Sequence, residues 1–137
     1  MLLQQRSDKK YHSGGLWTNA CCSHPEPGED TSDAASKRLR EELGFDTLLK
    51  KRFAFTYRAD FANGLTENEF DHVFTGVYDG EIIPDADEVK DYTYMSFDEI
   101  ESSINIQPLK FTPWFLIAFP EVKKIMSSNL PEIGTEK

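Results

Sequence analysis

The chain has 137 residues, of which 39% are hydrophobic, and it carries a formal net charge of -9. This size and composition fit one globular domain over residues 1–137 with a modest core. The acidic balance argues against general binding to nucleic acid or to an anionic membrane, because both are polyanions. Local basic residues or metal ions could still bind a small anion. No sequence pattern indicates an oligomeric state.

The cysteines and the first residues indicate the compartment. No apolar run is long enough to cross a bilayer, and residues 1–6 lack the charged start and apolar core of a signal peptide. Cys21 and Cys22 are adjacent, so they cannot join distant segments as the disulfides of secreted proteins do. Free thiols without an export signal predict a cytoplasmic protein.

The first third of the chain predicts two strands and a helix. Residues 1–6 and 16–22 read as short strands separated by a polar, glycine-containing loop. Residues 31–43 predict a helix, with Thr31 or Ser32 as the residue that caps its start.

An apolar stripe runs along this predicted helix. Ala35, Leu39 and Leu43 follow one another at four-residue spacing, which places them on one face. The charged residues between them, including Glu42, are expected on the other faces. Gly44 is expected to end the helix.

Further strands and a short helix follow. Residues 51–58 and 69–78 read as strands joined through an Asn63-Gly64 turn, and residues 92–95 read as another short strand. The sequence "SFDE" at 96–99 is a capping box that opens a short helix.

The last helix begins at Thr112-Pro113, with proline in its first turn. Pro120 is expected to kink this helix or to split it, and residues 127–137 are expected to form a flexible tail. Strands, a helix, more strands and two helices fit an α+β sandwich better than an alternating βαβ fold.

Two short phrases, "WTNACCSHP" and "TENE", contain the residue types that chemistry needs. Side chains alternate along a strand, so Cys22 and His24 would share one face, as would Glu67 and Glu69. His24, Glu67 and Glu69 would together offer nitrogen and oxygen ligands to Mg, Mn or Zn. A thiol beside a carboxylate could instead act as an acid/base pair. On spacing alone, buried cysteines, a turn histidine and solvated glutamates are the simpler interpretation.

The predicted first helix resembles the tail of the Nudix box, which holds Mg against a diphosphate with glutamates on one helix face. On the pattern G-x5-E-x7-R-E-U-x-E-E-x-G-U, the matching residues are Glu29, Leu39, Glu41, Glu42, Gly44 and Phe45. Ser23 replaces the first glycine, and Lys37-Arg38 replaces the Arg-Glu pair. The replaced glutamate binds catalytic metal in Nudix hydrolases, so the pattern favours the Nudix scaffold and weakens the hydrolase interpretation.

Five phrases in order resemble type I isopentenyl-diphosphate delta-isomerase. They are "LLQQRSDKKYHSGGLWTNACCSHP", "REELG", "FTYRADFANGLTENE", "DEVKDYTYMSFDEI" and "FTPWF", and the likeness extends from Leu2 to about Phe119. The resemblance implies a Nudix-like α/β/α sandwich with a mixed sheet. It also implies conversion of isopentenyl diphosphate to dimethylallyl diphosphate in isoprenoid biosynthesis. The implied partner is therefore a small-molecule diphosphate.

The resemblance assigns catalytic roles to three residues and a substrate-binding role to Trp114. It makes Cys22 and Glu69 the catalytic pair, and it gives Tyr57 a hydrogen bond to the glutamate. Trp114 would face the developing cation, which an aromatic ring stabilises without attacking it. Which of Cys22 and Glu69 donates the proton stays open at this point.

The resemblance also assigns the binding of metal and diphosphate. His24 and Glu67 would join Glu69 on a divalent metal, with Mg expected and Mn or Zn as alternatives. The residues implied to bind the diphosphate or its Mg are Arg6, Lys10, Ser23 and Glu42.

The family pattern has a further segment before "LLQQR", with two histidine ligands, a diphosphate-binding lysine and the opening strands. We therefore expect this chain to be a fragment or a natural short form. With three metal ligands where the family has five, we expect it to be a poor catalyst. A Nudix-type diphosphate hydrolase, or an inactive form that binds diphosphate or a partner through an exposed sheet edge, are the alternatives.

Overall fold

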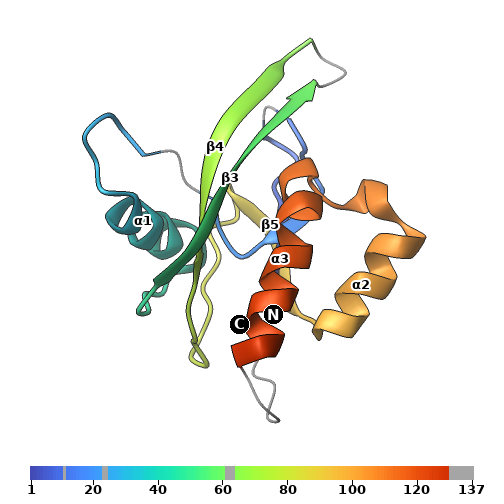
Figure 1. The fold of residues 1–137 in the computed structure, drawn as a ribbon. Coiled ribbons are helices and arrows are strands. Elements are labelled where there is room, and N and C mark those ends of the chain that lie inside the picture. The colour runs from blue at the N-terminus through green and yellow to red at the C-terminus, as the bar shows by residue number, and fades with distance from the viewer. Residues whose placement is uncertain (11, 23–24, 61–63, 130–137) are drawn as a thin grey trace.

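The computed structural model describes residues 1–10, 12–22, 25–60 and 64–129, without the side chains of residues 59, 67, 68, 128 and 129. Figure 1 shows how the elements are arranged. In chain order they are β1 (Leu2–Arg6), β2 (Trp17–Asn19), α1 (Thr31–Leu43), β3 (Lys50–Asp60), β4 (Thr66–Thr75), β5 (Val89–Tyr94), α2 (Phe97–Ile106), the short 3-10 helix η1 (Pro108–Lys110) and α3 (Pro113–Asn129).

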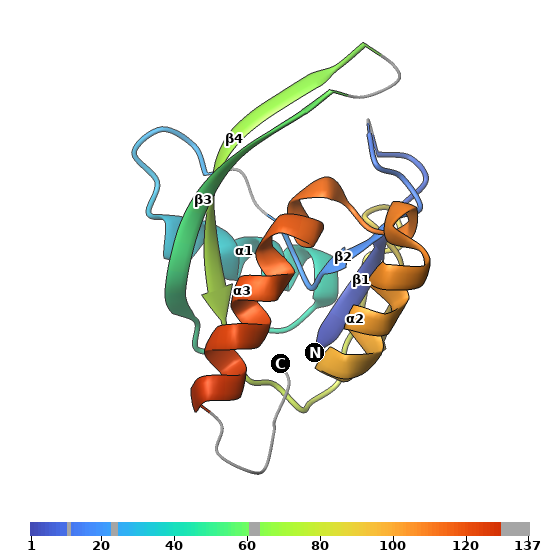
Figure 2. The ribbon, with the colours of Figure 1, turned by 45° about the vertical axis from the view of Figure 1, so that its right-hand side comes forward.

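The strands form two antiparallel groups. β1 is the central strand of a sheet with the order β2-β1-β5, and β3 pairs with β4 as a long ribbon. Among the described residues, the parallel part of the expected mixed sheet is limited to one bridge between Trp17 and Phe111. Helices α1 and α3 lie on the two sides of the ribbon (Figure 1), and a turned view separates β1 and β2 from the ribbon (Figure 2).

The core is divided by β1, because neighbouring residues of a strand point to opposite faces. One cluster, on the side of α1, contains Leu2, Leu39, Leu43, Phe45 and Val89. The other cluster, on the side of α2 and α3, contains Leu3, Ile100, Phe111, Phe115 and Phe119. Helices therefore cover both faces of the β1 sheet, and the predicted α+β sandwich is confirmed.

Helix α1 has the predicted bounds, but the residue that caps its N-terminus differs from the prediction. The N-cap is Asp30, whose Oδ1 accepts hydrogen bonds from the backbone N–H of Ser32 at 2.8 Å and of Asp33 at 3.1 Å. Thr31 is thus the first helical residue. An aspartate caps as well as a serine or threonine, and its charge also complements the positive end of the helix dipole. Gly44 ends the helix with a φ of 74°, as predicted.

The buried face of α1 also differs in one respect. Leu39 and Leu43 are buried as expected, but Ala34 rather than Ala35 accompanies them. Glu42, expected on a solvated face, is only 4% exposed. The helix therefore places a carboxylate in the interior of the protein.

Strand β2 is shorter than predicted, so only the start of the phrase "WTNACCSHP" lies on a strand. It ends at Asn19, whose Nδ2 donates to the carbonyl of Cys21 at 2.6 Å. Such a local side-chain bond competes with the strand ladder. The prediction that a strand reaches Cys22 was therefore wrong. His24 lies outside the described residues, so its position relative to Cys22 stays a prediction.

The later elements start or end a few residues from their predicted bounds. β4 begins at Thr66, so the phrase "TENE" lies on a strand, as its alternation argument requires. The capping box of α2 is confirmed by hydrogen bonds between Ser96 and Glu99. α3 continues through Pro120 without a split and includes residues 127–129 of the expected tail. Residues 130–137 lie outside the described part of the chain.

None of the helices in the described ranges has both the length and the apolar character that a membrane span requires.

A buried pair of hydroxyl groups joins β2 to the start of α3. Thr18 Oγ1 lies 2.8 Å from Thr112 Oγ1, and the two residues are 1% and 0% exposed. Thr112 also accepts from the backbone N–H of Phe115 at 3.3 Å and donates its own N–H to the carbonyl of Trp17 at 3.0 Å. These bonds fix the first turn of α3 against the end of β2.

We predict that Thr112→Val lowers the free energy of unfolding by about 1–3 kcal/mol, because Thr18 and the Phe115 N–H lose a buried partner. Chemical denaturation measures this change. Thr112→Ser keeps the hydroxyl and loses only a methyl group, so it is the matched control and should lose about 1 kcal/mol or less. Equal losses in both variants would show that packing of the methyl group, and not the hydroxyl, secures this junction.

Candidate active site

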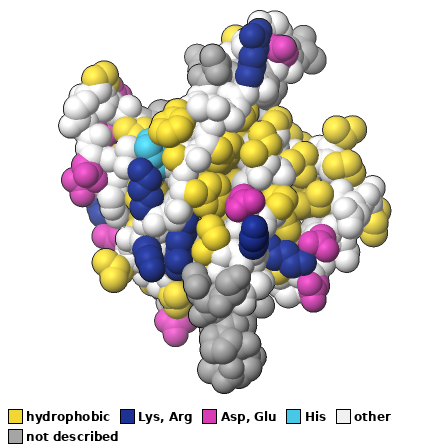
Figure 3. All heavy atoms as spheres, viewed as in Figure 1, with side chains coloured by type: hydrophobic (Ala, Val, Ile, Leu, Met, Phe, Trp, Pro, Cys, Tyr) yellow, Lys and Arg dark blue, Asp and Glu magenta, His cyan; other side chains and the backbone are white. Residues whose placement is uncertain are grey.

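Residues from β1, the end of β2, the β3–β4 ribbon and α3 line one cavity of about 440 Å³. Hydrophobic side chains gather on the face of the molecule that α3 crosses (Figure 3). The expected site residues that line the cavity are Arg6, Cys22, Tyr57, Glu69 and Trp114. The fold therefore brings together residues that lie far apart in the sequence.

The register of the ribbon places Tyr57 on β3 directly opposite Glu69 on β4. Opposed residues of an antiparallel pair project on the same face, with Cβ atoms roughly 4.5–5.5 Å apart. Tyr57 is buried, and its ring centroid lies 6.1 Å from that of Trp114. The tyrosine is thus a neighbour of both the carboxylate and the indole. Its hydrogen bond to Glu69 stays a prediction.

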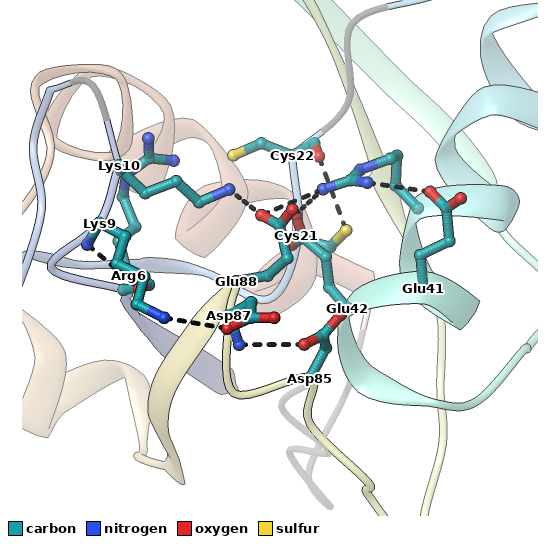
Figure 4. Close-up of polar contacts among 12 residues, drawn as sticks. Arg6, Lys9, Lys10, Cys21, Cys22, Glu41, Glu42, Asp85, Asp87 and Glu88 are labelled. Carbon is teal, nitrogen blue, oxygen red and sulfur yellow. Dashed lines mark hydrogen bonds and ion pairs between the residues drawn. The ribbon is translucent and has the colours of Figure 1, made fainter.

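The two adjacent cysteines have different surroundings. Cys21 packs against the core cluster around Leu2, and Figure 4 shows the two sulfur atoms directed to opposite sides of the chain. Burial raises the pKa of the Cys22 thiol to about 11, although a hydrogen bond from Asn19 and the charge of Arg6 oppose the rise. Burial raises the pKa of Cys21 still further. Both thiols are therefore protonated at neutral pH.

Trp114 stands in the first turn of α3 and is 8% exposed. The guanidinium carbon of Arg6 lies 5.1 Å from its ring centroid, a cation–π distance. The ring of His12 meets it edge-on at 5.9 Å, and Arg6 Nη2 donates to the His12 carbonyl at 3.3 Å. The π face of Trp114 thus already accommodates a positive charge.

Two more of the expected residues take part in an ion-pair network beside the cavity (Figure 4). Lys10 pairs with Glu88, and Arg38 pairs with Glu42 and lies 3.5 Å from Glu88. Glu42 Oε1 also accepts from Gln4 Nε2 at 3.0 Å. Protein groups therefore hold Lys10 and Glu42, and their contacts with diphosphate or Mg stay predictions.

Sequence reasoning missed four residues of this region, namely Gln4, Asn19, Arg38 and Glu88. The sequence predicted Arg38 as a departure from the Nudix box and as one of the charged residues away from the apolar stripe, although its spacing of four from Glu42 is a helical ion-pair signal. Burial opposes the charge of Arg38, but Glu42, Glu41 and Glu88 together outweigh this and raise its pKa. For Glu88, burial is outweighed by Lys10 and Arg38, which lower its pKa. No local pattern marks Gln4 or Asn19.

Of the three expected metal ligands, the structure describes the side chain of Glu69. Within the described ranges, no group of three or more His, Cys, Asp or Glu side chains could hold a metal ion. Ser23, His24 and the side chain of Glu67 lie outside the described residues. Glu69 is half-buried and lines the cavity, and a carboxylate is a donor that Mg, Mn and Zn accept. The Glu69 carboxylate therefore fits a divalent cation. Because the other two expected ligands are not described, the metal site of His24, Glu67 and Glu69 stays a prediction.

Comparisons with known proteins define the class. Residues 1–115 match the NUDIX domain family. The fold is similar to that of the MutT protein from Methanosarcina mazei Go1, with a TM-score of 0.70 over 94% of this chain and 84% of that one. It is also similar to the Nudix hydrolase RenU from M. smegmatis, with a TM-score of 0.58 over 98% and 78%. Both are 17% identical in sequence, which supports the shared fold alone. The chain is a Nudix domain.

Sequence similarity then gives the particular family. The "Isopentenyl-diphosphate Delta-isomerase 2" of Aromatoleum aromaticum is 45% identical over 94% of this chain and 68% of its own length. The "Isopentenyl-diphosphate Delta-isomerase" of Pectobacterium atrosepticum is 49% identical over 89% and 68%. The chain belongs to the isopentenyl-diphosphate delta-isomerase family, and it spans about two thirds of the length of these relatives. The resemblance found in the sequence is confirmed.

We predict that Glu88→Gln lowers the free energy of unfolding at neutral pH, because Lys10 and Arg38 lose a charged partner. The folded-state pKa of Glu88 is lowered. Its stabilising contribution is therefore complete above the unfolded-state value of about 4.3 and is lost as pH falls through the folded value. Chemical denaturation at several pH values should show the wild type and the variant converging in acid.

The exposed Glu81→Gln is the matched control for this change. It should leave stability nearly unchanged at all pH values. A difference between Glu88→Gln and the wild type that persists undiminished in acid would contradict the assignment of the effect to this ion pair.

Proposed function

We propose that this chain converts isopentenyl diphosphate to dimethylallyl diphosphate by adding a proton at one end of an allylic unit and removing one at the other. The observation that carries the proposal is the single cavity shared by Cys22, Glu69 and Trp114. The names of the relatives reported above support the same substrate class, a small-molecule diphosphate.

The reaction needs two proton-transfer groups. Protonation of an unactivated alkene gives a tertiary carbocation, and loss of a proton from the neighbouring carbon completes the shift of the double bond. Cys22 and Glu69 come from different elements, so they can act at different positions of one flat substrate. Because the reaction is reversible, each group gives a proton in one direction and takes it in the other.

Trp114 and Arg6 support the charges of the substrate. The indole face stabilises a cation without forming a bond to it, and Arg6 already demonstrates that a cation fits there. Arg6, Lys10 and Ser23 are proposed to bind the diphosphate. Transfer of the Arg6 guanidinium to this anion would leave the indole face to the carbocation.

A divalent metal is proposed at His24, Glu67 and Glu69, with Mg expected and Mn or Zn as alternatives, and Glu42 is proposed to lie near a Mg on the diphosphate. When bound, the metal supplies positive charge that changes the basicity of a coordinated carboxylate. We also propose the cytoplasm as the location, because a reducing compartment keeps the described free cysteines as thiols.

The adjacent cysteines provide a matched test of this function. We predict that Cys22→Ala lowers kcat by roughly 100-fold or more, the usual range for loss of an acid/base group. Cys21→Ala, on the core side, should retain most of the turnover. NMR of the substrate and product measures the conversion, and inorganic phosphate is assayed in the same samples.

Full turnover by Cys22→Ala would overturn the assignment of the thiol. Release of phosphate without dimethylallyl diphosphate would favour a Nudix-type hydrolase, because hydrolysis needs no thiol. Binding of substrate without either product would indicate an inactive diphosphate-binding form.

A further inference from the structure

Asn19, the last residue of β2, contacts two of the groups on which the proposed reaction depends. Its Nδ2 donates to the carbonyl of Cys21 at 2.6 Å and lies 3.5 Å from Cys22 Sγ. Its Oδ1 accepts from the indole Nε1–H of Trp114 at 3.2 Å. Asn19 also lines the cavity itself.

The amide of Asn19 can adopt only one orientation in this setting. The indole N–H is a donor only, and the Cys21 carbonyl is an acceptor only. Oδ1 must therefore face Trp114, and Nδ2 must face the chain at Cys21 and Cys22. A flipped amide would place donor against donor and acceptor against acceptor, leaving buried groups unpaired.

The amide oxygen of Asn19 also accepts a hydrogen bond from Thr18. Thr18 Oγ1 lies 2.7 Å from Asn19 Oδ1 and 2.8 Å from Thr112 Oγ1. Thr112 precedes the first residue of α3, the helix that carries Trp114. The amide is therefore anchored to the same junction that holds α3 against β2.

The sulfur of Cys22 lies against both ends of this amide, 3.5 Å from Nδ2 and 3.7 Å from Oδ1. The chain leaves β2 at Asn19, so the position of Cys22 is not set by a strand ladder. The two contacts of Asn19, to the Cys21 carbonyl and to the sulfur, hold this part of the chain together with the bond from Gln4 to the Ala20 carbonyl.

We propose that Asn19 is a positioning residue that holds the Cys22 thiol and the Trp114 indole in a fixed position relative to each other. The catalytic consequence rests on the proposed function. A proton-transfer group and a cation-stabilising ring must both contact the same substrate. A misplacement of either group by about 1 Å can cost roughly 100-fold in rate. Asn19 controls this relative placement without touching the diphosphate.

The test uses the full chain and two variants of Asn19. Asn19→Leu keeps the branching and the number of side-chain heavy atoms but has no polar atoms, whereas Asn19→Asp keeps an acceptor for the indole and loses the Nδ2 donor. The chain has two tryptophans, so its indole N–H groups give two NMR cross-peaks, which Trp17→Phe assigns. Asn105→Leu, at an exposed position of α2, is the matched control.

We expect Asn19→Leu to move the Trp114 indole cross-peak upfield and to lower kcat by about 10- to 100-fold with KM nearly unchanged. Asn19→Asp should keep the indole hydrogen-bonded, with its cross-peak at or downfield of the wild-type position because a carboxylate is the stronger acceptor, and should still lower kcat. Asn105→Leu should change neither quantity. The indole position separates this role from a general loss of structure, because a structural defect would not spare it in one variant alone.

An unmoved Trp114 cross-peak in Asn19→Leu, or full kcat in either Asn19 variant, would overturn the proposal. If Asn19→Leu does not fold, Asn19→Asp decides by its kcat. If the wild-type chain shows no isomerisation, the proposed function fails, and the Trp114 cross-peak alone decides whether Asn19 holds the indole.

Discussion

The buried carboxylate of Glu42 is the constraint on which the arrangement around β1 depends. Glu42 is 4% exposed, and burying a carboxylate costs several kcal/mol unless charge and hydrogen bonds compensate it. Arg38, one turn earlier on α1, supplies the charge, and Gln4 on β1 supplies the hydrogen bond. The same Gln4 amide donates to the carbonyl of Ala20 at 2.6 Å. Through Gln4, the Glu42 carboxylate thus connects α1, β1 and the segment before the two cysteines.

A second junction places the aromatic part of the site. The hydroxyls of Thr18 and Thr112 fasten α3 to β2, and Asn19 extends that junction to the indole and the thiol. The ribbon contributes Glu69 and Tyr57 from the other side of the cavity. Beside this cavity, Lys10 is paired with Glu88 and Arg38 is paired with Glu42.

Features set by neighbouring residues were predictable from the sequence, and features set by distant contacts were not. The length of α1, its glycine end and the capping box of α2 follow from local spacing. The end of β2 was missed because a side-chain bond from Asn19 to Cys21 overrides the strand pattern. The burial of Glu42 depends on Gln4, which is 38 residues away. Five residues named by the family resemblance line the cavity, namely Arg6, Cys22, Tyr57, Glu69 and Trp114. The resemblance gave no role to Asn19, whose partner Trp114 lies 95 residues away.

We propose that this cavity moves protons on an isopentenyl unit. The most direct measurement is NMR of the chain incubated with isopentenyl diphosphate and Mg in deuterated water. We predict dimethylallyl diphosphate that carries solvent deuterium at the newly formed methyl group, because the added proton comes from an exchangeable protein group. Product without deuterium, or phosphate released from an unisomerised substrate, would contradict it.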